Sequence, residues 1–264
     1  MRLLVVDDYD ALNLAAADLI VAAVAAHPTA TVVPATGDTP MGLYRALASR
    51  RRRGEVDFSR LRVFQLDAYL DLAPDDRRSL YRWMKESFLD PLGVPAPNVT
   101  RLPGDALDPE AACAAYGRAV REAGGIDVSI LGLGPNGHLG FNEPPAGPPA
   151  LTRVVDLSEA SVESNARYWG GRERVPRHAM TAGMDALLAA RRTVLLVSGE
   201  RKRDILRRTI EGPITPAVPA SYLRDAADVT VVADRAAWPG PVPEMIGGAN
   251  ENEDQRGRAS CAAS

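Results

Sequence analysis

The sequence predicts an α/β fold in which a mostly parallel, Rossmann-like sheet lies between two layers of helices. Short apolar runs alternate with amphipathic stretches from one end of the chain to the other, as in proteins built from strand–helix–strand units. With 46% hydrophobic and 25% charged residues, the 264-residue chain can bury a substantial core. No internal repeat or interdomain linker is visible. We therefore expect a single three-layer αβα domain over residues 1–238.

Each element is predicted from its local pattern, in chain order. Residues 11–26 are expected to form a helix because Ala, Leu, Ile and Val occupy most of its faces, and residues 31–34 a short buried strand. A second helix over residues 41–50 is favoured by Pro40, which suits a first helical turn. The further strands are expected at residues 61–66, 127–133, 193–198 and 229–233, with an extended segment at 152–157. The further helices are expected at residues 79–88, 109–122, from Ser158 onward, 181–190 and 200–211.

The bulk properties exclude several classes of protein. A formal net charge of -3 argues against a nucleic-acid binder, which usually carries a basic surplus. The two cysteines, Cys113 and Cys261, lie far apart, so neither a disulfide nor a cysteine-based metal site is expected. The N-terminal apolar run is too short for a secretory signal, and no run approaches membrane-spanning length. We expect a cytoplasmic protein without membrane contact whose residues 239–264 form a disordered tail; its oligomeric state is open.

Ligand binding is expected at three loops that follow predicted strands. In open α/β sheets, ligands bind outside the carboxyl ends of the strands. This rule selects residues 35–40, 67–69 and 132–144, and each of these segments has unusual chemistry. We therefore expect the functional residues of the chain to lie in these three loops.

The first loop is suited to an anion. Thr36 and Thr39 offer hydroxyl groups, and Gly37 lets the backbone approach a ligand closely. The free N–H groups and the dipole at the start of the following helix also favour negative charge. We expect these residues and Asp38 to form a phosphate cradle, although the carboxylate disfavours an anion unless it points away. The alternative is a helix cap in which Thr39 or Asp38 satisfies the helix start.

The second loop places Asp67 directly after an apolar strand. A carboxylate in this position can be held partly dry, which raises its pKa and makes it a useful general base. The alternative is a helix cap or turn residue, since carboxylates are common at strand ends. The residue alone does not decide between a catalytic and a structural role.

The third loop, Gly132-Leu-Gly-Pro-Asn-Gly-His-Leu-Gly-Phe-Asn-Glu-Pro144, contains the histidine with the most unusual surroundings. Its glycines, Gly137 among them, permit tight turns in which backbone amides line a pocket. Imidazole titrates near neutral pH, so His138 can pass protons to and from a sugar ring oxygen. Glu143 is near enough for the loop to fold its carboxylate onto the ring. Metal binding is the weaker alternative, because one histidine and one carboxylate make a poor ligand set.

These motifs resemble the glucosamine-6-phosphate deaminase (isomerase) family, which shares its fold with the 6-phosphogluconolactonases. The similarity covers residues 1–235 in order. Its most specific element is Asn136-Gly-His-Leu-Gly-Phe-Asn-Glu-Pro144, which is similar to the deaminase signature, whereas lactonases usually continue from the histidine with Thr-Ala-Ser-Leu-Phe-Pro. The segments that begin at Ala35 and Phe64 are similar to the family's phosphate loop and to its Phe-Asn-x-Asp-Glu-Tyr segment.

The resemblance implies an aldose-to-ketose isomerisation coupled to loss of ammonia, with isomerase and hydrolase character and no need for a metal or a cofactor. It implies that His138 helps to open the pyranose ring, with Glu143 tuning it and Asn136 in the same catalytic loop. Asp67 would take a proton from carbon 2 and return it at carbon 1 through an enolamine. The expected substrate is glucosamine 6-phosphate.

Two cations are assigned by the resemblance only. The segments Ser164-Asn-Ala-Arg-Tyr168 and Gly199-Glu-Arg-Lys202 are similar to those that place an arginine and a lysine on the substrate phosphate. This similarity implies phosphate-binding roles for Arg167 and Lys202. From spacing alone, both residues would be interpreted as surface charges. The expected partner is thus a small phosphorylated sugar.

Departures from the family pattern leave the substrate open. An alternative hypothesis is an isomerase or epimerase of another phosphorylated sugar or cyclitol, with the same enediol chemistry and no deamination. A non-catalytic sugar-phosphate sensor is disfavoured by the retained proton-transfer residues, and a lactonase by the second half of the signature. The departures are Ala68 in place of Glu, Asn136 where many members have Asp, the proline-rich residues 145–149, and Ser79-Leu-Tyr81 in place of Ser-Tyr-His or Ser-Tyr-Tyr.

Overall fold

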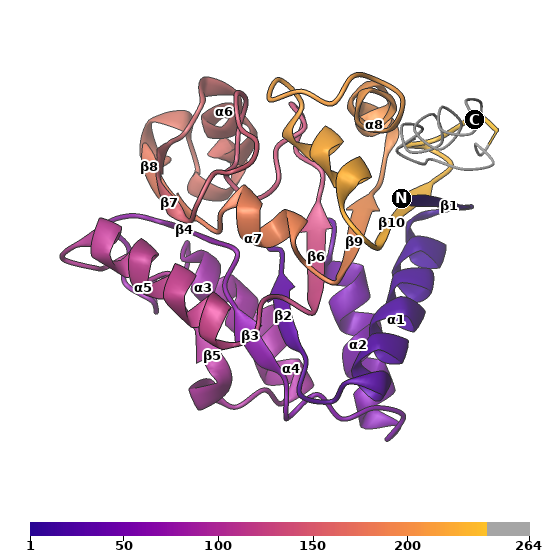
Figure 1. Ribbon diagram of the computed structural model, residues 1–264, viewed down its shortest axis with the longest axis horizontal. Helices are drawn as coiled ribbons and strands as arrows, with labels where there is room; N and C mark the ends of the chain where they lie inside the picture. Colours follow the sequence, from indigo (N-terminus) through magenta and orange to yellow (C-terminus); the bar gives the residue numbers. More distant parts are fainter. Residues whose placement is uncertain (242–264) are drawn as a thin grey trace, which may run out of the picture.

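A seven-stranded parallel sheet forms the centre of the computed structural model, which describes residues 1–241 (Figure 1). The strand order is β1-β10-β9-β6-β2-β3-β5, and every neighbouring pair is parallel. The predicted α/β class is therefore confirmed. The strands are β1 (Arg2–Val6), β2 (Thr31–Pro34), β3 (Arg62–Phe64), β5 (Val99–Thr100), β6 (Val128–Gly132), β9 (Arg192–Val197) and β10 (Val229–Asp234).

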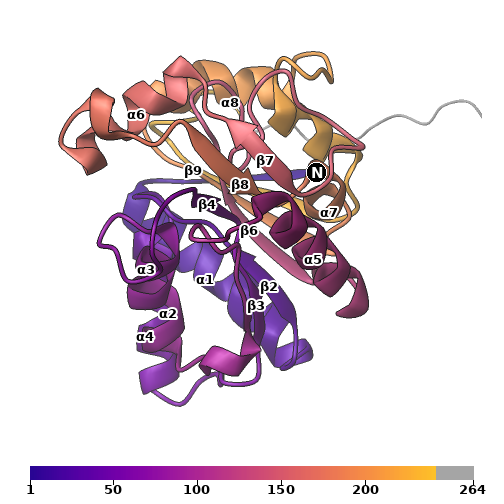
Figure 2. The same ribbon diagram turned by 90° about the vertical axis from the view of Figure 1, so that its left-hand side faces the viewer.

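Helices cover both faces of this sheet, which gives the three expected layers (Figure 2). One face carries α1 (Tyr9–Ala26), α2 (Met41–Arg52), α3 (Leu80–Met84) and α4 (Asp90–Leu92), with a π-helical turn at Lys85–Leu89 joining the last two. The other face carries α5 (Pro109–Glu122), α7 (Met184–Leu188) and α8 (Arg203–Ile210). Short 3-10 turns lie at Ala96–Asn98, Arg172–Arg174, Glu200–Lys202 and Pro219–Asp225.

The central strands are mostly apolar because both of their faces are buried. Along β9, Leu195 and Val197 pack with α5, α7 and α8, whereas Val194 and Leu196 pack with α1 and α2. Successive side chains of a strand point to opposite faces, so a strand between two helical layers needs no polar residues. This burial explains why the strong apolar runs of the sequence predict the central strands correctly.

The path of the chain through the sheet fixes the place of the site. From β2 the chain moves outward through β3 to β5, and it then returns to β6 on the other side of β2. The strands β2 and β6 are direct neighbours, with Pro34 paired to Ile130. Two loops that leave adjacent strands in opposite directions open a crevice at the carboxyl edge of the sheet. Residues 35–40 and 132–144 flank this crevice.

A second, smaller sheet was not predicted as such. It consists of β4 (Asp67–Tyr69), β8 (His178–Thr181) and β7 (Arg153–Asp156), all antiparallel, and it packs with α6 (Glu159–Trp169). We call residues 67–69 and 153–181 the small-sheet unit. Its own apolar cluster includes Phe141 of the third loop, so the unit is joined to the crevice.

Several predicted boundaries are wrong, and long-range pairing is the reason. The helix expected at 181–190 spans only Met184–Leu188, because Thr181 is the last residue of β8 and pairs with both Asp67 and Arg153. The strand expected at 61–66 ends at Phe64, and β4 starts at Asp67. The edge strand β1 was not predicted, and the helix expected from residue 200 begins as a 3-10 turn.

Helix α1 corrects one statement about membranes. By length and apolar composition Tyr9–Ala26 could cross a membrane, contrary to the expectation that no segment has this length. The helix contains Asp10 and Asp18 and packs against α2, β1, β9 and β10, so its apolar residues are also those of a core helix.

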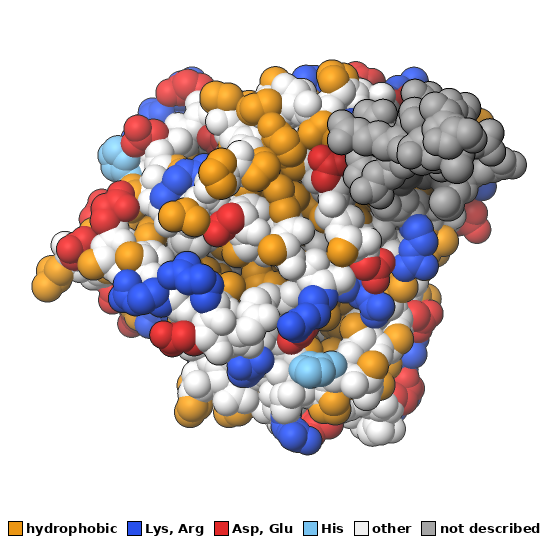
Figure 3. Space-filling view, in the orientation of Figure 1, with side chains coloured by type: hydrophobic (Ala, Val, Ile, Leu, Met, Phe, Trp, Pro, Cys, Tyr) orange, Lys and Arg blue, Asp and Glu red, His pale blue; other side chains and the backbone are white. Residues whose placement is uncertain are grey.

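Positive and negative side chains are interspersed over the molecular surface on the face shown in Figure 3. Residues 242–264, which include most of the predicted tail and Cys261, lie outside the described part of the chain.

Candidate active site

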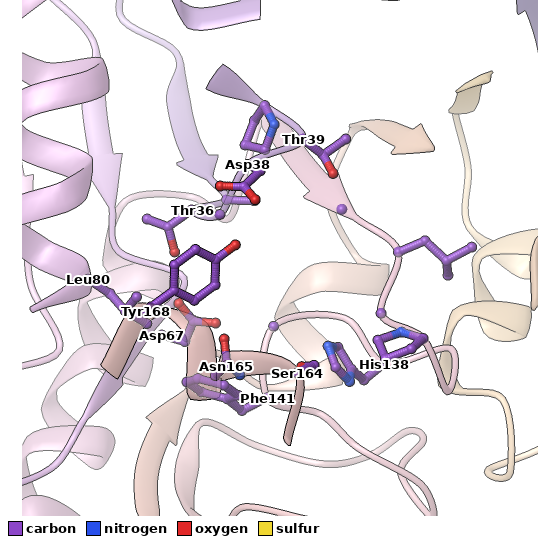
Figure 4. A pocket seen from close by; sticks show the side chains of 18 of the residues that line it. Thr36, Asp38, Thr39, Asp67, Leu80, His138, Phe141, Ser164, Asn165 and Tyr168 are labelled. Atoms are coloured by element: carbon purple, nitrogen blue, oxygen red, sulfur yellow. The ribbon is translucent and has the colours of Figure 1, made fainter. Parts of the chain in front are cut away.

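A cavity of about 880 Å³ lies at the carboxyl ends of β2, β3, β6 and β9, and α6 forms one of its walls. Thr36, Asp38 and Thr39 lie along one side of this space, and Asp67 and His138 border it from other loops (Figure 4). The three predicted loops therefore converge on one cavity. Further lining residues are Tyr69, Leu80, Trp83, Phe141, Glu163, Ser164, Asn165, Arg167, Tyr168, Glu200, Arg201 and Lys202.

The first loop presents backbone and hydroxyl groups to the cavity. Gly37 has a φ of 98°, a left-handed conformation that side chains other than glycine rarely adopt. The Tyr9 hydroxyl holds the turn, since it accepts from the Gly42 N–H at 3.0 Å and lies 3.0 Å from the carbonyl of Thr39, to which it can donate. Thr36 and Thr39 line the cavity at the start of α2. The loop thus has the geometry of an anion cradle.

Asp67 is buried where the two sheets meet. Its side chain borders the cavity, and its Oδ1 has no hydrogen-bond partner among residues 1–241. The backbone is fixed by pairing with Thr181 and by Gln65, whose Nε2 donates to the Asp67 carbonyl at 2.8 Å. Burial raises the pKa of Asp67 to about 7. The predicted direction of this shift is confirmed, and a carboxyl group with this pKa can both accept and donate a proton near neutrality.

His138 lies in a tight turn that only a glycine permits. A Cβ on Gly134 would lie 2.2 Å from Cδ2 of the imidazole, so the ring occupies the space of the missing side chain. Burial, and secondarily the charge of Lys202, lowers the pKa of His138 to about 4. The expectation of titration near neutral pH is thus wrong, because the depth of the histidine could not be derived from the sequence. The histidine is neutral at pH 7.

Glu143 connects the histidine to helix α6. Its Oε1 lies 3.7 Å from Nδ1 of His138 and accepts from the hydroxyl of Ser161, while its Oε2 accepts from the Ser158 N–H at 2.6 Å. Burial raises the pKa of Glu143, and the hydrogen bond from Ser158 opposes this shift. Since Ser158 caps α6, the start of this helix holds the carboxylate beside the ring, although Nδ1 of His138 has no hydrogen-bond partner among residues 1–241. The serines were missed from the sequence because no local pattern links them to the third loop.

Like Glu143, the predicted residues Asn136 and Gly137 of the third loop do not reach the cavity lining. The Asn136 Oδ1 accepts from the His138 N–H at 3.3 Å, so this residue shapes the turn. Gly137 is buried with a φ of 86°, and a Cβ there would meet Val218 at 2.8 Å. The structure therefore places both residues behind the histidine.

Two cations assigned by resemblance lie at the cavity. The Nζ of Lys202 donates to the Leu133 carbonyl at 2.5 Å, and burial together with the charge of Arg167 lowers the pKa of Lys202 to about 8. Arg167, on the last turn of α6, stacks its guanidinium 4.6 Å from the ring centre of Tyr168. The loop before Lys202 is anchored by Asp234, which accepts from the Gly199 N–H at 3.1 Å and from the Ser198 hydroxyl. An anion facing Thr36 and Thr39 would therefore meet two positive groups.

Most departures from the family pattern lie away from the cavity lining. Ala68 is buried in the main core, and its neighbours Asp67 and Tyr69 border the cavity instead. Residues 145–149 also lie outside the lining, and Gly147 packs beneath Tyr222. Leu80 is the departure that does line the cavity. The reasons for expecting an altered substrate are therefore weaker in three dimensions than in the sequence.

The fold and this site define an enzyme that moves protons on a small anionic substrate. A neutral imidazole, a carboxyl group that titrates near neutrality and an anion cradle border one cavity. Among residues 1–241, no three His, Cys, Asp or Glu side chains gather in a way that could hold a metal ion.

Comparisons with known proteins name the family. The family described as glucosamine-6-phosphate isomerases/6-phosphogluconolactonase matches residues 8–232. Glucosamine-6-phosphate deaminase of Halothermothrix orenii is 40% identical over 238 residues, which cover 90% of this chain and 98% of that protein. Glucosamine-6-phosphate deaminase 2 of Bacillus subtilis is 41% identical over 239 residues, with coverages of 90% and 96%. The chain belongs to this family and is an enzyme of the isomerase type.

Solved structures agree with this assignment. A monomeric glucosamine-6-phosphate deaminase superposes with a TM-score of 0.87 at 35% identity, covering 90% of this chain and 98% of that one. The 6-phosphogluconolactonase of Thermotoga maritima gives a TM-score of 0.70 at 22% identity, with coverages of 88% and 98%. The second comparison shows the shared fold alone.

Proposed function

We propose that this protein converts glucosamine 6-phosphate and water into fructose 6-phosphate and ammonia, in the cytoplasm. The observation that carries the proposal is the meeting of Asp67 and His138 at one cavity beside an anion cradle. The deaminase relatives, at about 40% identity over 90% of the chain, support the substrate. The release of ammonia gives the reaction its hydrolytic component.

The phosphate group fixes the substrate in the cavity. Thr36, Thr39 and the backbone at Gly37 bind its oxygens from one side, and Arg167 and Lys202 supply the balancing charge. An anchor at one end of a six-carbon sugar holds the other end at the proton-transfer groups. Such positioning lowers the barrier because the reacting atoms start within contact distance.

His138 opens the pyranose ring. In its neutral form it can take the proton of the carbon-1 hydroxyl and deliver a proton to the ring oxygen, which yields the open-chain aldehyde. The Glu143 carboxylate, 3.7 Å from Nδ1, stabilises the charge that the ring carries between these two transfers. Asn136 contributes through the turn that holds the histidine backbone.

Asp67 then moves the proton between neighbouring carbons. Its carboxylate takes the proton from carbon 2, and the C–H electron pair forms the double bond of an enolamine between carbons 1 and 2. The carbonyl oxygen of carbon 1 takes a proton from the ammonium group of the substrate, which becomes the neutral amine of the enolamine. The protonated Asp67 returns the proton at carbon 1, which leaves an iminium group at carbon 2. Water adds to this carbon and ammonia departs, giving the ketose. A pKa of about 7 suits both halves of the transfer.

An isomerase or epimerase of another phosphorylated sugar or cyclitol is the second candidate. It rests on Ala68 and the proline-rich residues 145–149, neither of which lines the cavity. Leu80, which does line it, is the remaining feature in its favour. The comparisons do not favour this candidate.

One assay tests the proposal. The purified protein is incubated with glucosamine 6-phosphate in deuterated water, and ammonia, fructose 6-phosphate and carbon-bound deuterium are measured. We expect equal amounts of both products and deuterium at carbon 1 whenever the shuttled proton exchanges with solvent. Absence of ammonia, with deuterium exchange into a different phosphorylated sugar or cyclitol, would overturn the proposal in favour of the second candidate.

A further inference from the structure

Asp38 is an unusual residue in a loop that otherwise suits an anion. Its neighbours Gly37 and Thr39 present backbone and hydroxyl groups to the cavity, yet Asp38 adds a negative charge at the same place. The structure shows where this charge is directed. The Asp38 Oδ2 lies 2.8 Å from Nη2 of Arg167, which belongs to the last turn of α6 on the opposite wall.

The surroundings of Arg167 give this pair a defined geometry. The same Nη2 lies 2.5 Å from the Tyr168 hydroxyl, and the guanidinium lies over the Tyr168 ring. Figure 4 shows the Tyr168 hydroxyl directed toward Asp38. Burial and the neighbouring Asp38 carboxylate raise the pKa of Tyr168 to about 12, so its hydroxyl keeps its proton. The carboxylate, the guanidinium and the phenol thus form one group at the mouth of the cavity.

The pair is held loosely enough to be exchanged. The side chains of Arg167 and Asp38 are 65% and 60% exposed, and ion pairs at such exposure contribute little because water and salt screen them. Lys202 differs, since it is partly buried and its Nζ donates to a carbonyl rather than to a carboxylate. A doubly charged phosphate near Lys202 would attract Arg167 more strongly than a single carboxylate does.

We propose that Asp38 is an internal counter-ion, which pairs with Arg167 and is displaced from it by the phosphate of the substrate. The exchange weakens phosphate binding and speeds the release of phosphorylated product. The inference deepens the proposed function and rests on it only in the assignment of Arg167 to phosphate. Asp38 is therefore an affinity-setting residue, whereas the sequence alone suggested a member of the phosphate cradle.

The test measures binding apart from turnover. Inorganic phosphate and fructose 6-phosphate are titrated into the full-length protein by calorimetry at low ionic strength. We expect Asp38→Asn to lower both dissociation constants roughly 3- to 10-fold, and to slow release of fructose 6-phosphate correspondingly. Glu163→Gln is the matched control, because Glu163 also lines the cavity and is exposed but forms no ion pair among residues 1–241. It should change both constants by less than about twofold.

A second background separates competition from a general charge effect. In Arg167→Gln, Asp38→Asn should change phosphate affinity by less than about twofold, because the competed cation is gone. An equal gain in both backgrounds, or weaker binding in Asp38→Asn alone, would overturn the counter-ion. Unchanged thermal unfolding checks that each variant is folded. If ammonia never forms while Asp38→Asn still tightens phosphate binding in the Arg167-dependent way, the proposed function fails and the counter-ion stands.

Discussion

The main parallel sheet and the small-sheet unit contribute to the site in different ways. The main sheet is packed on both faces, and its strand ends hold the Thr36–Thr39 turn, His138 and Lys202. The small-sheet unit has one modest apolar cluster and supplies Arg167 and Tyr168 through α6. Asp67 stands at the junction, as the first residue of β4 directly beyond β3. We infer that the large core of the main sheet fixes the positions of the reacting groups. The small-sheet unit, with its smaller core, sets the affinity for phosphate.

The largest effect is expected at the junction. Asp67→Asn removes the proton acceptor and should lower kcat by roughly 10²- to 10⁴-fold, measured as ammonia release.

The same change, Asp67→Asn, should stabilise the fold at pH 8. The folded-state pKa of Asp67 is about 7, well above the unfolded value, so the stability that the neutral carboxyl provides is lost as pH rises from about 4 to about 7. Asn removes this loss, which amounts to at most about 4 kcal/mol.

Denaturant unfolding at pH 5 and pH 8 checks the second half of this prediction. The gain from Asp67→Asn should be larger at the higher pH. Equal stability changes at both values would show that Asp67 is not held neutral by burial. Turnover near the wild-type rate would show that another group moves the proton.

A matched pair of leucines tests the difference between the two cores. Leu195 of β9 is fully buried in the main core, and Leu195→Ala should lower the free energy of unfolding by about 3 to 5 kcal/mol. Leu157, which precedes α6, lies in the small cluster, and Leu157→Ala should cost about 1 to 3 kcal/mol while also raising KM. Equal costs without a change in KM for Leu157→Ala would contradict the proposed division of roles.

Removal of the Arg167 guanidinium should raise KM more than it lowers kcat. Arg167→Gln is expected to raise KM roughly 10- to 100-fold with a much smaller change in kcat, because a charge-assisted contact to phosphate is lost far from the reacting carbons. Arg172→Gln is the control, since Arg172 follows the same helix but pairs with Glu159 away from the cavity. A fall in kcat larger than the rise in KM would mean that α6 supports the chemical step directly.

The pH dependence of kcat/KM should reflect the ionisation of one proton-transfer group, Asp67, and one phosphate-binding group, Lys202. We expect kcat/KM to rise through pH about 7 as Asp67 ionises, and to fall above pH about 8 as Lys202 loses its proton and attracts phosphate less. In Lys202→Arg the cation stays charged, so the alkaline limb should move upward by more than about one pH unit. An unchanged alkaline limb would assign it to a different group.

The smallest effect is expected at the turn of the first loop. Tyr9→Phe deletes the hydroxyl that joins the Gly42 N–H to the Thr39 carbonyl. It should raise KM roughly 3- to 10-fold and leave kcat nearly unchanged. Tyr222→Phe, beside Gly147 and outside the cavity lining, should leave both KM and kcat nearly unchanged. A matching change in both variants would indicate a general loss of stability instead.

The two regions also differ in how far the sequence predicts them. Strands such as β9 and β10 are mostly apolar segments of six residues, and this composition predicts burial on both faces from the local sequence. By contrast, β4 and β8 are segments of three and four residues that become strands only by pairing with each other. Propensity over so short a window carries little information, whereas long-range pairing decides the outcome.

The site follows the same division. The place of Asp67 at a strand end and the glycines around His138 are local features, so both residues could be selected before the fold was known. The contact between Asp38 and Arg167 joins segments that are distant in the sequence, so no local pattern predicts it. The depth of His138 is likewise a property of the assembled loops.

The space at Gly134 makes the catalytic loop vulnerable to the smallest mutation. Every amino acid other than glycine carries a Cβ, and at this position that atom would overlap the imidazole of His138. Any missense change of its codon therefore moves the ring or the turn. In a saturation library selected for growth on the amino sugar, position 134 should be as intolerant as position 67, although it contributes no reactive group.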